Sequence, residues 1–286
     1  NFNAGYGYAR RNANISPAFY NPMQTMDGGQ GFEVPGFVSF FQASRTQQLL
    51  KAGVNWQPTD KLTFGLTGHY TDDQYHDLTY GLQDGHSWML NLDATYAYNE
   101  DTSVSAYVTS QNLSQNQTNL QSAAVTATKP SATALNVPVG ATWSNILSEN
   151  DVTLGLGIRK SGLLSGKLDF AGDLTYSLGK TGYNTQFNYT SANLGGATCS
   201  SVFYLTCGNL PDINNKMIVL KLTGSYKLSK ASKIIFGYMY QRLLSNDYFY
   251  NAYQVGATPT TLLPTNQQVP TYNVNVVSVA YIYTFR

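Results

Sequence analysis

The side chains able to do acid–base or metal chemistry are few in this 286-residue chain. Three histidines with nearby aspartates could in principle supply a metal site or a catalytic triad. Their spacing, however, matches no metal-ligand pattern and no nucleophile–base pattern. We therefore interpret them as polar residues of strands and loops. They are His69, His76 and His86, with Asp72, Asp73 and Asp77 close by.

The other acidic and sulfur-containing residues give no catalytic signature either. Asp169 and Asp173 would share one face of a strand at a separation of about 13 Å, too far for a pair of catalytic carboxylates. The chain has no Gly-x-Ser-x-Gly, no phosphate-binding loop and no Cys-x-x-Cys-His. We expect no enzyme activity and no cofactor bound by the chain itself. Cys199 and Cys207 lie in a Gly/Ser/Thr-rich stretch, where a disulfide is expected in an oxidising compartment.

Composition narrows the class of protein. Only 12% of the residues are charged and the net charge is +1, so no basic stripe is available to nucleic acid. The chain nevertheless holds 22 Tyr and 13 Phe, while its mean hydropathy is only −0.25. No run approaches the roughly 18 apolar residues of a membrane helix. A β-barrel wall, whose alternate residues face lipid and lumen, explains this combination. A secreted β-sandwich or β-solenoid is the alternative.

Alternation with a period of two residues marks the predicted strands. In 87–98, 168–178 and 218–228, apolar or aromatic residues occupy every second position, with polar residues between them. A helix would scatter both sets around its circumference. Weaker segments near 50–56, 62–70 and 152–158 follow the same scheme. The polar residues predicted to face the lumen are Lys51, Asn55, Thr67, Asn91, Asp93, Arg159, Asp169, Asp173, Lys221 and Lys227.

Aromatic residues collect near the ends of these predicted strands. Membrane-interface girdles have this placement, because an amphipathic ring suits the headgroup layer. A soluble sandwich would have no reason for it. The predicted lipid-facing girdle consists of Trp56, Tyr70, Trp88, Tyr96, Tyr176, Tyr226, Tyr281, Tyr283 and Phe285.

The connections between strands supply a second argument. We count ten strands, with short turns at 58–61, 99–101, 163–166 and 229–232 alternating with long polar connections. Outer-membrane barrels have short periplasmic turns and long external loops. Residues 1–286 are therefore predicted to form a single region of an all-β, antiparallel transmembrane barrel in the bacterial outer membrane. The expected external loops are about 12–44, 74–85, 113–138, 180–215 and 244–272.

Several stretches, taken in order over most of the chain, resemble the MtrB/PioB family of outer-membrane barrels associated with decahaem cytochromes. The family's barrels have far more than ten strands, so the resemblance implies the C-terminal portion of a larger barrel. The final strand, within 272–286, also ends in an aromatic residue, Phe285, before Arg286. The stretches that carry the resemblance are 57–62, 166–169, 210–213, 220–228, 238–242, 247–248 and 272–281.

This resemblance implies the function of a sheath. Such a barrel encloses and insulates a periplasmic multihaem c-type cytochrome, which carries electrons across the outer membrane. The haem would belong to the partner, the predicted lumen-facing residues would contact it, and an outer-surface cytochrome would be a second partner. Two alternatives remain open: a small porin or passive diffusion channel, and a structural or adhesive surface barrel. Haem absorbance of the purified complex would separate the first reading from the other two.

Overall fold

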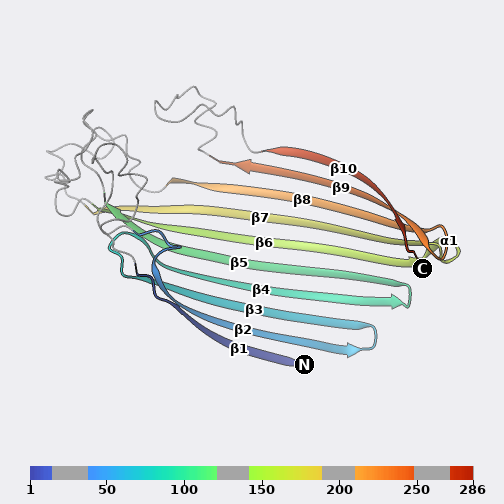
Figure 1. Ribbon diagram of the computed structural model, residues 1–286, viewed down its shortest axis with the longest axis horizontal. Coiled ribbons are helices and arrows are strands. Elements are labelled where there is room, and N and C mark those ends of the chain that lie inside the picture. Colours follow the sequence, from blue (N-terminus) through green and yellow to red (C-terminus); the bar gives the residue numbers. More distant parts are fainter. Residues whose placement is uncertain (15–37, 121–141, 189–209, 248–270, 286) are drawn as a thin grey trace, which may run out of the picture.

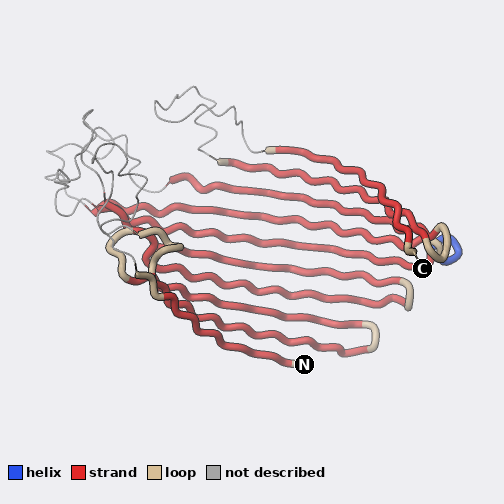
Figure 2. The backbone as a smooth tube through the Cα atoms, in the orientation of Figure 1, coloured by secondary structure: helices blue, strands red, loops and turns tan. Residues whose placement is uncertain are grey.

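The computed structural model describes residues 1–14, 38–120, 142–188, 210–247 and 271–285, which form one antiparallel sheet (Figures 1 and 2). Its ten strands are hydrogen-bonded in chain order without a crossover. The predicted all-β antiparallel fold is thereby confirmed. The strands are β1 (Phe2–Arg11), β2 (Ser44–Thr59), β3 (Leu62–His76), β4 (Gly81–Asn99), β5 (Thr102–Leu120), β6 (Thr142–Gly162), β7 (Leu168–Asn188), β8 (Leu210–Lys227), β9 (Ser232–Asn246) and β10 (Tyr272–Tyr283).

Tight connections join β2 to β3, β4 to β5, β6 to β7 and β8 to β9 at one end of the sheet, called here the short-turn end. The opposite end is called the long-connection end. Between β6 and β7, the four residues of α1 (Leu163–Gly166) form a turn rather than a regular helix. Leu164 and Ser165 have φ of 53° and 58°, and the flanking Gly162 and Gly166 also have positive φ. Glycine favours such positions because it has no Cβ. Both chain ends lie at the short-turn end (Figure 1).

The strands reach further towards the long-connection end than the sequence predicted. β3 ends at His76 and β4 begins at Gly81, so residues 77–80 alone connect them. The expected long loop at 74–85 was therefore wrong, and the alternation of short and long connections fails there. The expected loops at 113–138 and 180–215 also began too early, because β5 runs to Leu120 and β7 to Asn188.

These strand extensions are polar on both faces, which is why their sequence resembles that of a loop. A β-ladder needs only backbone N–H and C=O groups, and polar side chains can add cross-strand bonds to it. Asn112 Nδ2 donates to Asn150 Oδ1 at 2.9 Å between β5 and β6. Thr185 Oγ1 donates to Asn145 Oδ1 at 2.9 Å between β7 and β6. Period-two hydrophobicity marks only the part of a strand that meets an apolar medium.

The sheet has almost no conventional core. Val38 and Ala43 are the only buried apolar residues in the described ranges. Large apolar side chains point outward instead; Leu92, Leu154 and Leu156 are 47%, 49% and 60% exposed. A soluble sandwich would bury this face, whereas a membrane protein turns it to lipid. The secreted-sandwich alternative does not fit this arrangement.

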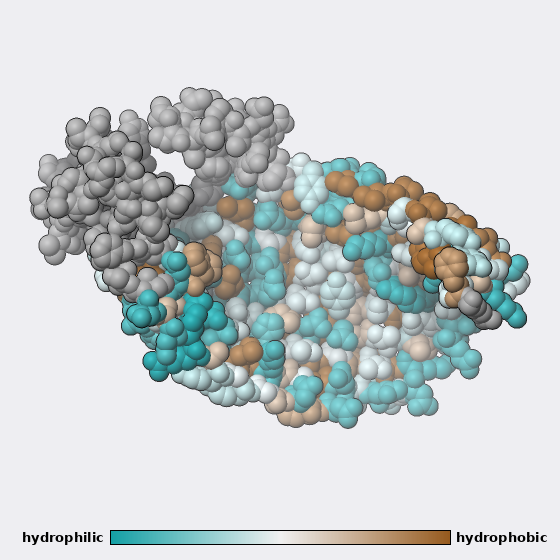
Figure 3. Space-filling view, viewed as in Figure 1, coloured by the Kyte–Doolittle hydropathy of each residue, from teal (hydrophilic) through white to brown (hydrophobic). Residues whose placement is uncertain are grey.

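The two faces of the sheet also differ in how exposed their side chains are, because the sheet is curved. On β6 the apolar residues at 152, 154, 156 and 158 are exposed, while Asp151, Thr153 and Gly155 between them are half-buried or buried. Side chains converge on the concave side of a bent sheet, so the polar set lies on the inner face and the apolar set on the outer face. Figure 3 shows polar and small residues across the broad face of the sheet.

The sheet is not closed, since no pairing joins β1 to β10 within the described residues. In hydrocarbon, an unpaired strand edge leaves backbone polar groups without partners, which costs several kcal/mol per group. Both edges therefore need further strands in the membrane, consistent with part of a larger barrel. Within the described part of the chain, no helix is long and apolar enough to span a membrane.

Candidate functional site

The inner face of the sheet is the candidate functional surface. Strand registers place all ten predicted lumen-facing residues on this face, although they come from six different strands. Direct cross-strand neighbours include Thr67 and Asn91, and Asp173 and Lys221. Their contact with a partner stays a prediction.

A hydrogen-bonded group occupies the middle of this face on β4 and β5. Thr109 Oγ1 donates to Asn91 Oδ1 at 2.7 Å, and Asn91 Nδ2 donates to Asp93 Oδ1 at 3.0 Å. Asn91 and Asp93 are two residues apart and therefore project from the same side of β4. The bonds hold the amide and carboxylate side chains along the strand, where they offer fixed acceptors to whatever fills the lumen.

Charged side chains form a second group nearer the short-turn end. Arg159 Nη2 lies 3.0 Å from Asp173 Oδ1, and Lys227 Nζ lies 3.2 Å from Asp169 Oδ2. Lys221 stands directly across from Asp173. The charges of the three cationic side chains and the two carboxylates in this group therefore nearly balance. Such exposed pairs contribute at most about 1 kcal/mol each to stability, because solvent screens them.

Glycines on the inner face let larger side chains lie flat against the wall. Tyr107 on β5 lies over Gly155 on β6, and a Cβ at Gly155 would overlap its ring. Its hydroxyl reaches Thr175 Oγ1 on β7 at 3.4 Å. Asp93 covers Gly65 in the same manner. A close approach of this kind is available only where the residue beneath has no side chain. At these two places the wall consequently projects little into the lumen.

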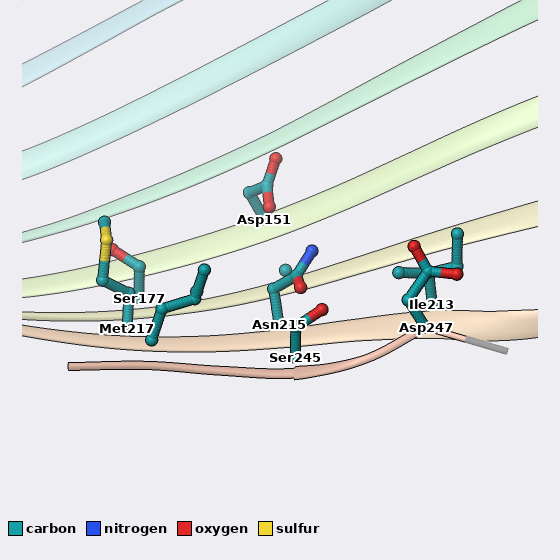
Figure 4. Close-up of a pocket in the computed structure, with 9 residues that line it drawn as sticks. Asp151, Ser177, Ile213, Asn215, Met217, Ser245 and Asp247 are labelled. Atoms are coloured by element: carbon teal, nitrogen blue, oxygen red, sulfur yellow. The ribbon is translucent and has the colours of Figure 1, made fainter. Parts of the chain in front are cut away.

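A hollow of about 440 Å³ lies on the inner face towards the long-connection end (Figure 4). The residues that surround it were not predicted from the sequence. Gln111 Nε2 donates to Asp151 Oδ2 at 3.2 Å, so one carboxylate is already engaged. Alternation alone indicated that odd-numbered residues of β6 face inward, but β6 was expected to begin near 152. The lining includes Asp151, Ser177, Asn215, Met217, Ser245 and Asp247.

The outer face carries the predicted girdle residues. Trp56, Tyr70, Trp88, Tyr96, Tyr176, Tyr226, Tyr281 and Tyr283 all share the apolar face of their strands. Phe285 lies beyond β10, with its ring 4.9 Å from that of Tyr283. Their position at a membrane interface is a prediction, because no lipid is present.

These aromatic residues are distributed over two levels of the outer face. Trp56 and Phe64 stack with ring centroids 5.6 Å apart near the short-turn end, and Tyr70 pairs with Trp88 further along. Six residues separate Phe64 from Tyr70, a length of about 20 Å along the strand. On β4, Leu90, Leu92 and Ala94 fill the interval. The spacing agrees with the apolar band of outer-membrane barrels, which is about 25 Å tall.

The remaining candidates do not come together. His69 lies on the inner face opposite Lys51, His76 Nε2 lies 3.0 Å from Thr46 Oγ1, and His86 lies on the outer face. Within the described residues, no group of three or more His, Cys, Asp or Glu side chains could hold a metal ion. The predicted disulfide between Cys199 and Cys207 lies outside the described residues.

Comparison with known proteins relates this geometry to known barrels. Residues 1–285 match the family model described as "Putative outer membrane beta-barrel porin, MtrB/PioB". No curated protein matches the chain. The whole chain aligns with 38% of the copper transporter OprC, at 11% identity and a TM-score of 0.58. In BauA, the ferric preacinetobactin receptor from Acinetobacter baumannii, 38% of the receptor aligns with 86% of the chain, at 10% identity and a TM-score of 0.54.

These solved structures share the fold alone, since their sequence identities are low. The chain spans less than two-fifths of the length of either one. Its ten strands therefore follow an arc of the wall of much longer outer-membrane proteins. Together with the family match, this similarity places the chain in the outer membrane.

Proposed function

Because the chain belongs to the MtrB/PioB family of porin-like outer-membrane β-barrel proteins, we propose that it is part of a sheath around a multihaem cytochrome. The enclosed partner would be a periplasmic c-type cytochrome, which carries electrons across the outer membrane within the barrel. The chain would supply insulation and a polar environment, and the haem would belong to the partner. It would itself catalyse no reaction.

The curvature of the sheet carries this proposal. Ten strands closed on themselves would leave a narrow lumen, because an eight-stranded barrel is already filled by its own side chains. Here the ten strands remain open and align with a minor part of large barrels. A larger barrel with these strands as one arc of its wall would have a wider lumen, because barrel diameter grows with the number of strands.

The inner face supports the same proposal. A cytochrome surface is polar and charged, and lipid would not accept it. The inner face offers nearly balanced charges, as at Arg159 and Asp173, and hydrogen-bonding groups such as Asn91. Flat-lying side chains such as Tyr107 leave room next to the wall. We infer that this polar surface would contact the partner without binding its haem.

The decisive experiment is purification of the intact protein from its own cells in mild detergent. We expect c-type haem absorbance to co-elute with the protein at several haems per polypeptide. The bound cytochrome should also fill the lumen, so the complex should conduct few ions in planar bilayers. A haem-free preparation with steady conductance would refute the sheath.

A pair of neighbouring substitutions tests whether the inner face meets the partner. Thr67 projects inward between Gly53 and Asn91, whereas Leu66 projects outward. Thr67→Trp should lower the haem recovered per barrel, because the ring would occupy the space of the cytochrome. Leu66→Trp should leave it unchanged, since lipid accommodates a larger apolar side chain. Equal haem recovery from both variants would contradict an enclosed partner.

A diffusion channel is the second candidate, favoured by the hydrated charges around Asp173 and Lys221 on the inner face. In that case Lys221→Glu should shift the ion selectivity of the open pore towards cations. Conductance without haem, together with this shift, would favour the channel over the sheath. An adhesive function would depend on the long connections, and their deletion should abolish attachment while sparing conductance.

A further inference from the structure

Basic side chains gather on the outer face of β7, β8 and β9, just beyond the apolar band at the long-connection end. On β7 and β8 the cation stands one outward-facing position past the last large apolar residue, and on β9 Arg242 lies between the outward-facing Tyr240 and Leu244. Leu178 is followed by Lys180, Ile218 is preceded by Lys216, and Tyr240 is followed by Arg242. The apolar band of the outer face predicts that they lie where the acyl chains of a bilayer end and its headgroups begin.

The three cations run diagonally across neighbouring strands. In the register, Lys216 lies opposite Leu178 and Leu244, so Lys180 and Arg242 are its diagonal neighbours. Diagonal neighbours across a sheet have Cα atoms about 7–8 Å apart. Long, flexible side chains at that spacing can converge on one anionic group.

Positive charge is in excess here. Lys180 Nζ lies 2.7 Å from Asp212 Oδ2. Lys216 and Arg242 are exposed and form no ion pair within the described residues. Asp212 is also the sole carboxylate on the outer face of the described parts of these three strands. The surface therefore carries three cations against one anion.

A general preference of Lys and Arg for the interface does not explain this cluster. Such a preference would distribute basic residues around the whole wall. On β3 and β4 the same level carries Asp72, Asp84 and His86 instead. At this level basic residues are thus concentrated on β7–β9, with Arg10 of β1 as an isolated further cation. Such a cluster indicates a localised ligand.

We propose that Lys180, Lys216 and Arg242 bind the phosphate groups of lipopolysaccharide in the outer leaflet. An Arg guanidinium can donate two parallel hydrogen bonds to a phosphate, while Lys supplies a compact charge. Asn273 on β10 lies directly across from Arg242 and offers a neutral donor. The site commits to a lipid because it adjoins the apolar band, where acyl chains pack beside it. It is independent of any partner in the lumen.

The test measures lipopolysaccharide retained by the intact protein after detergent extraction and washing. The variant Lys216→Gln/Arg242→Gln removes two charges while keeping the side chains long. It should retain roughly thirtyfold less lipopolysaccharide, given the usual contribution of each basic residue to anionic lipid binding. The control Lys160→Gln/Lys233→Gln removes two charges at the short-turn end, one outer and one inner, and should retain the normal amount.

Two further arms separate the possible sources of phosphate. Unaltered protein should retain little lipopolysaccharide whose lipid A phosphates have been removed, and phosphatidylglycerol vesicles should not displace the native lipid. Equal retention by the two double variants, or undiminished retention of the dephosphorylated form, would overturn the proposal. Displacement by phosphatidylglycerol would instead indicate general attraction to anionic lipid and would also overturn it. If the double variant does not fold, each single variant should retain about fivefold less.

Discussion

At the scale of single residues, the shape of the inner face depends on glycines that leave room for a neighbouring side chain to pack flat against the backbone. Tyr107 spans from β5 across Gly155 to Thr175 on β7 and so ties three strands together. The contact needs space that only glycine leaves. Because the Tyr107 ring lies flat against the wall, it occupies little of the lumen. A substitution at Gly155 should therefore affect both the stability of the barrel and the shape of its lumen.

Gly155→Ala should destabilise the barrel by about 1–3 kcal/mol, because the added Cβ overlaps the Tyr107 ring and forces it from the wall. The measurement is urea unfolding of the protein in lipid vesicles. Gly5→Ala is the matched control, since nothing lies within 4 Å of a Cβ there. Adding Tyr107→Ala should relieve the overlap. Additive effects of the two substitutions would show that no such contact exists.

Asp173→Asn is expected to change stability by less than about 1 kcal/mol in the same assay, since Arg159 and Asp173 are 54% and 44% exposed. A loss above about 2 kcal/mol would mean that the pair is shielded from water. Thr153→Asn, at an inner position of β6 without an ion pair, controls for the effect of a new amide on the inner face.

At the scale of the strand, alternate residues of β6 belong to two different media. Leu154 faces outward near the middle of the apolar band, and its neighbour Thr153 faces inward, where its hydroxyl lies 3.0 Å from that of Ser177. Both positions lie in the same hydrogen-bonded ladder. A difference in stability between equivalent substitutions at the two positions therefore reports on the medium that each face contacts.

Leu154→Arg should cost about 2–4 kcal/mol, the penalty for a cation near the bilayer midplane. Thr153→Arg should cost much less, because its guanidinium would remain hydrated in the lumen. Reversible folding into vesicles, followed by intrinsic Trp fluorescence, measures both. Equal penalties at the two positions would contradict the assignment of the faces.

At the scale of the whole molecule, the tight turns β2–β3, β4–β5, β6–β7 and β8–β9 lie at one end of the sheet, and both chain ends lie there too (Figure 1). Outer-membrane barrels place such turns in the periplasm. The long-connection end, with the short link 77–80, would then face the cell exterior.

Cysteine labelling tests this orientation in intact cells, in a background with Cys199 and Cys207 replaced by serine. Leu78→Cys, between β3 and β4, should react with a membrane-impermeant maleimide. Ala231→Cys, in the turn before β9, should react only after the outer membrane is permeabilised. The reverse pattern would invert the proposed topology and place the lipopolysaccharide site in the wrong leaflet.

The sequence by itself determined which face the residues of the apolar strand segments occupy. Period two is a property of the local chain, so Lys51, Asp93 and Lys221 could be assigned to one side without knowing any neighbour. It also indicated the apolar band and its aromatic limits. It underestimated strand length, because polar extensions such as that of β5 to Leu120 lack a hydrophobic signal.

Only the tertiary structure decided which side chains meet. The placement of Tyr107 over Gly155, of Lys221 opposite Asp173 and of the basic diagonal on β7–β9 depends on register. Register is a relation between strands whose partners can be distant in sequence, and it is set by the pairing of whole ladders. The open arc has the same origin, since curvature accumulates over all ten strands and is encoded in none of them singly.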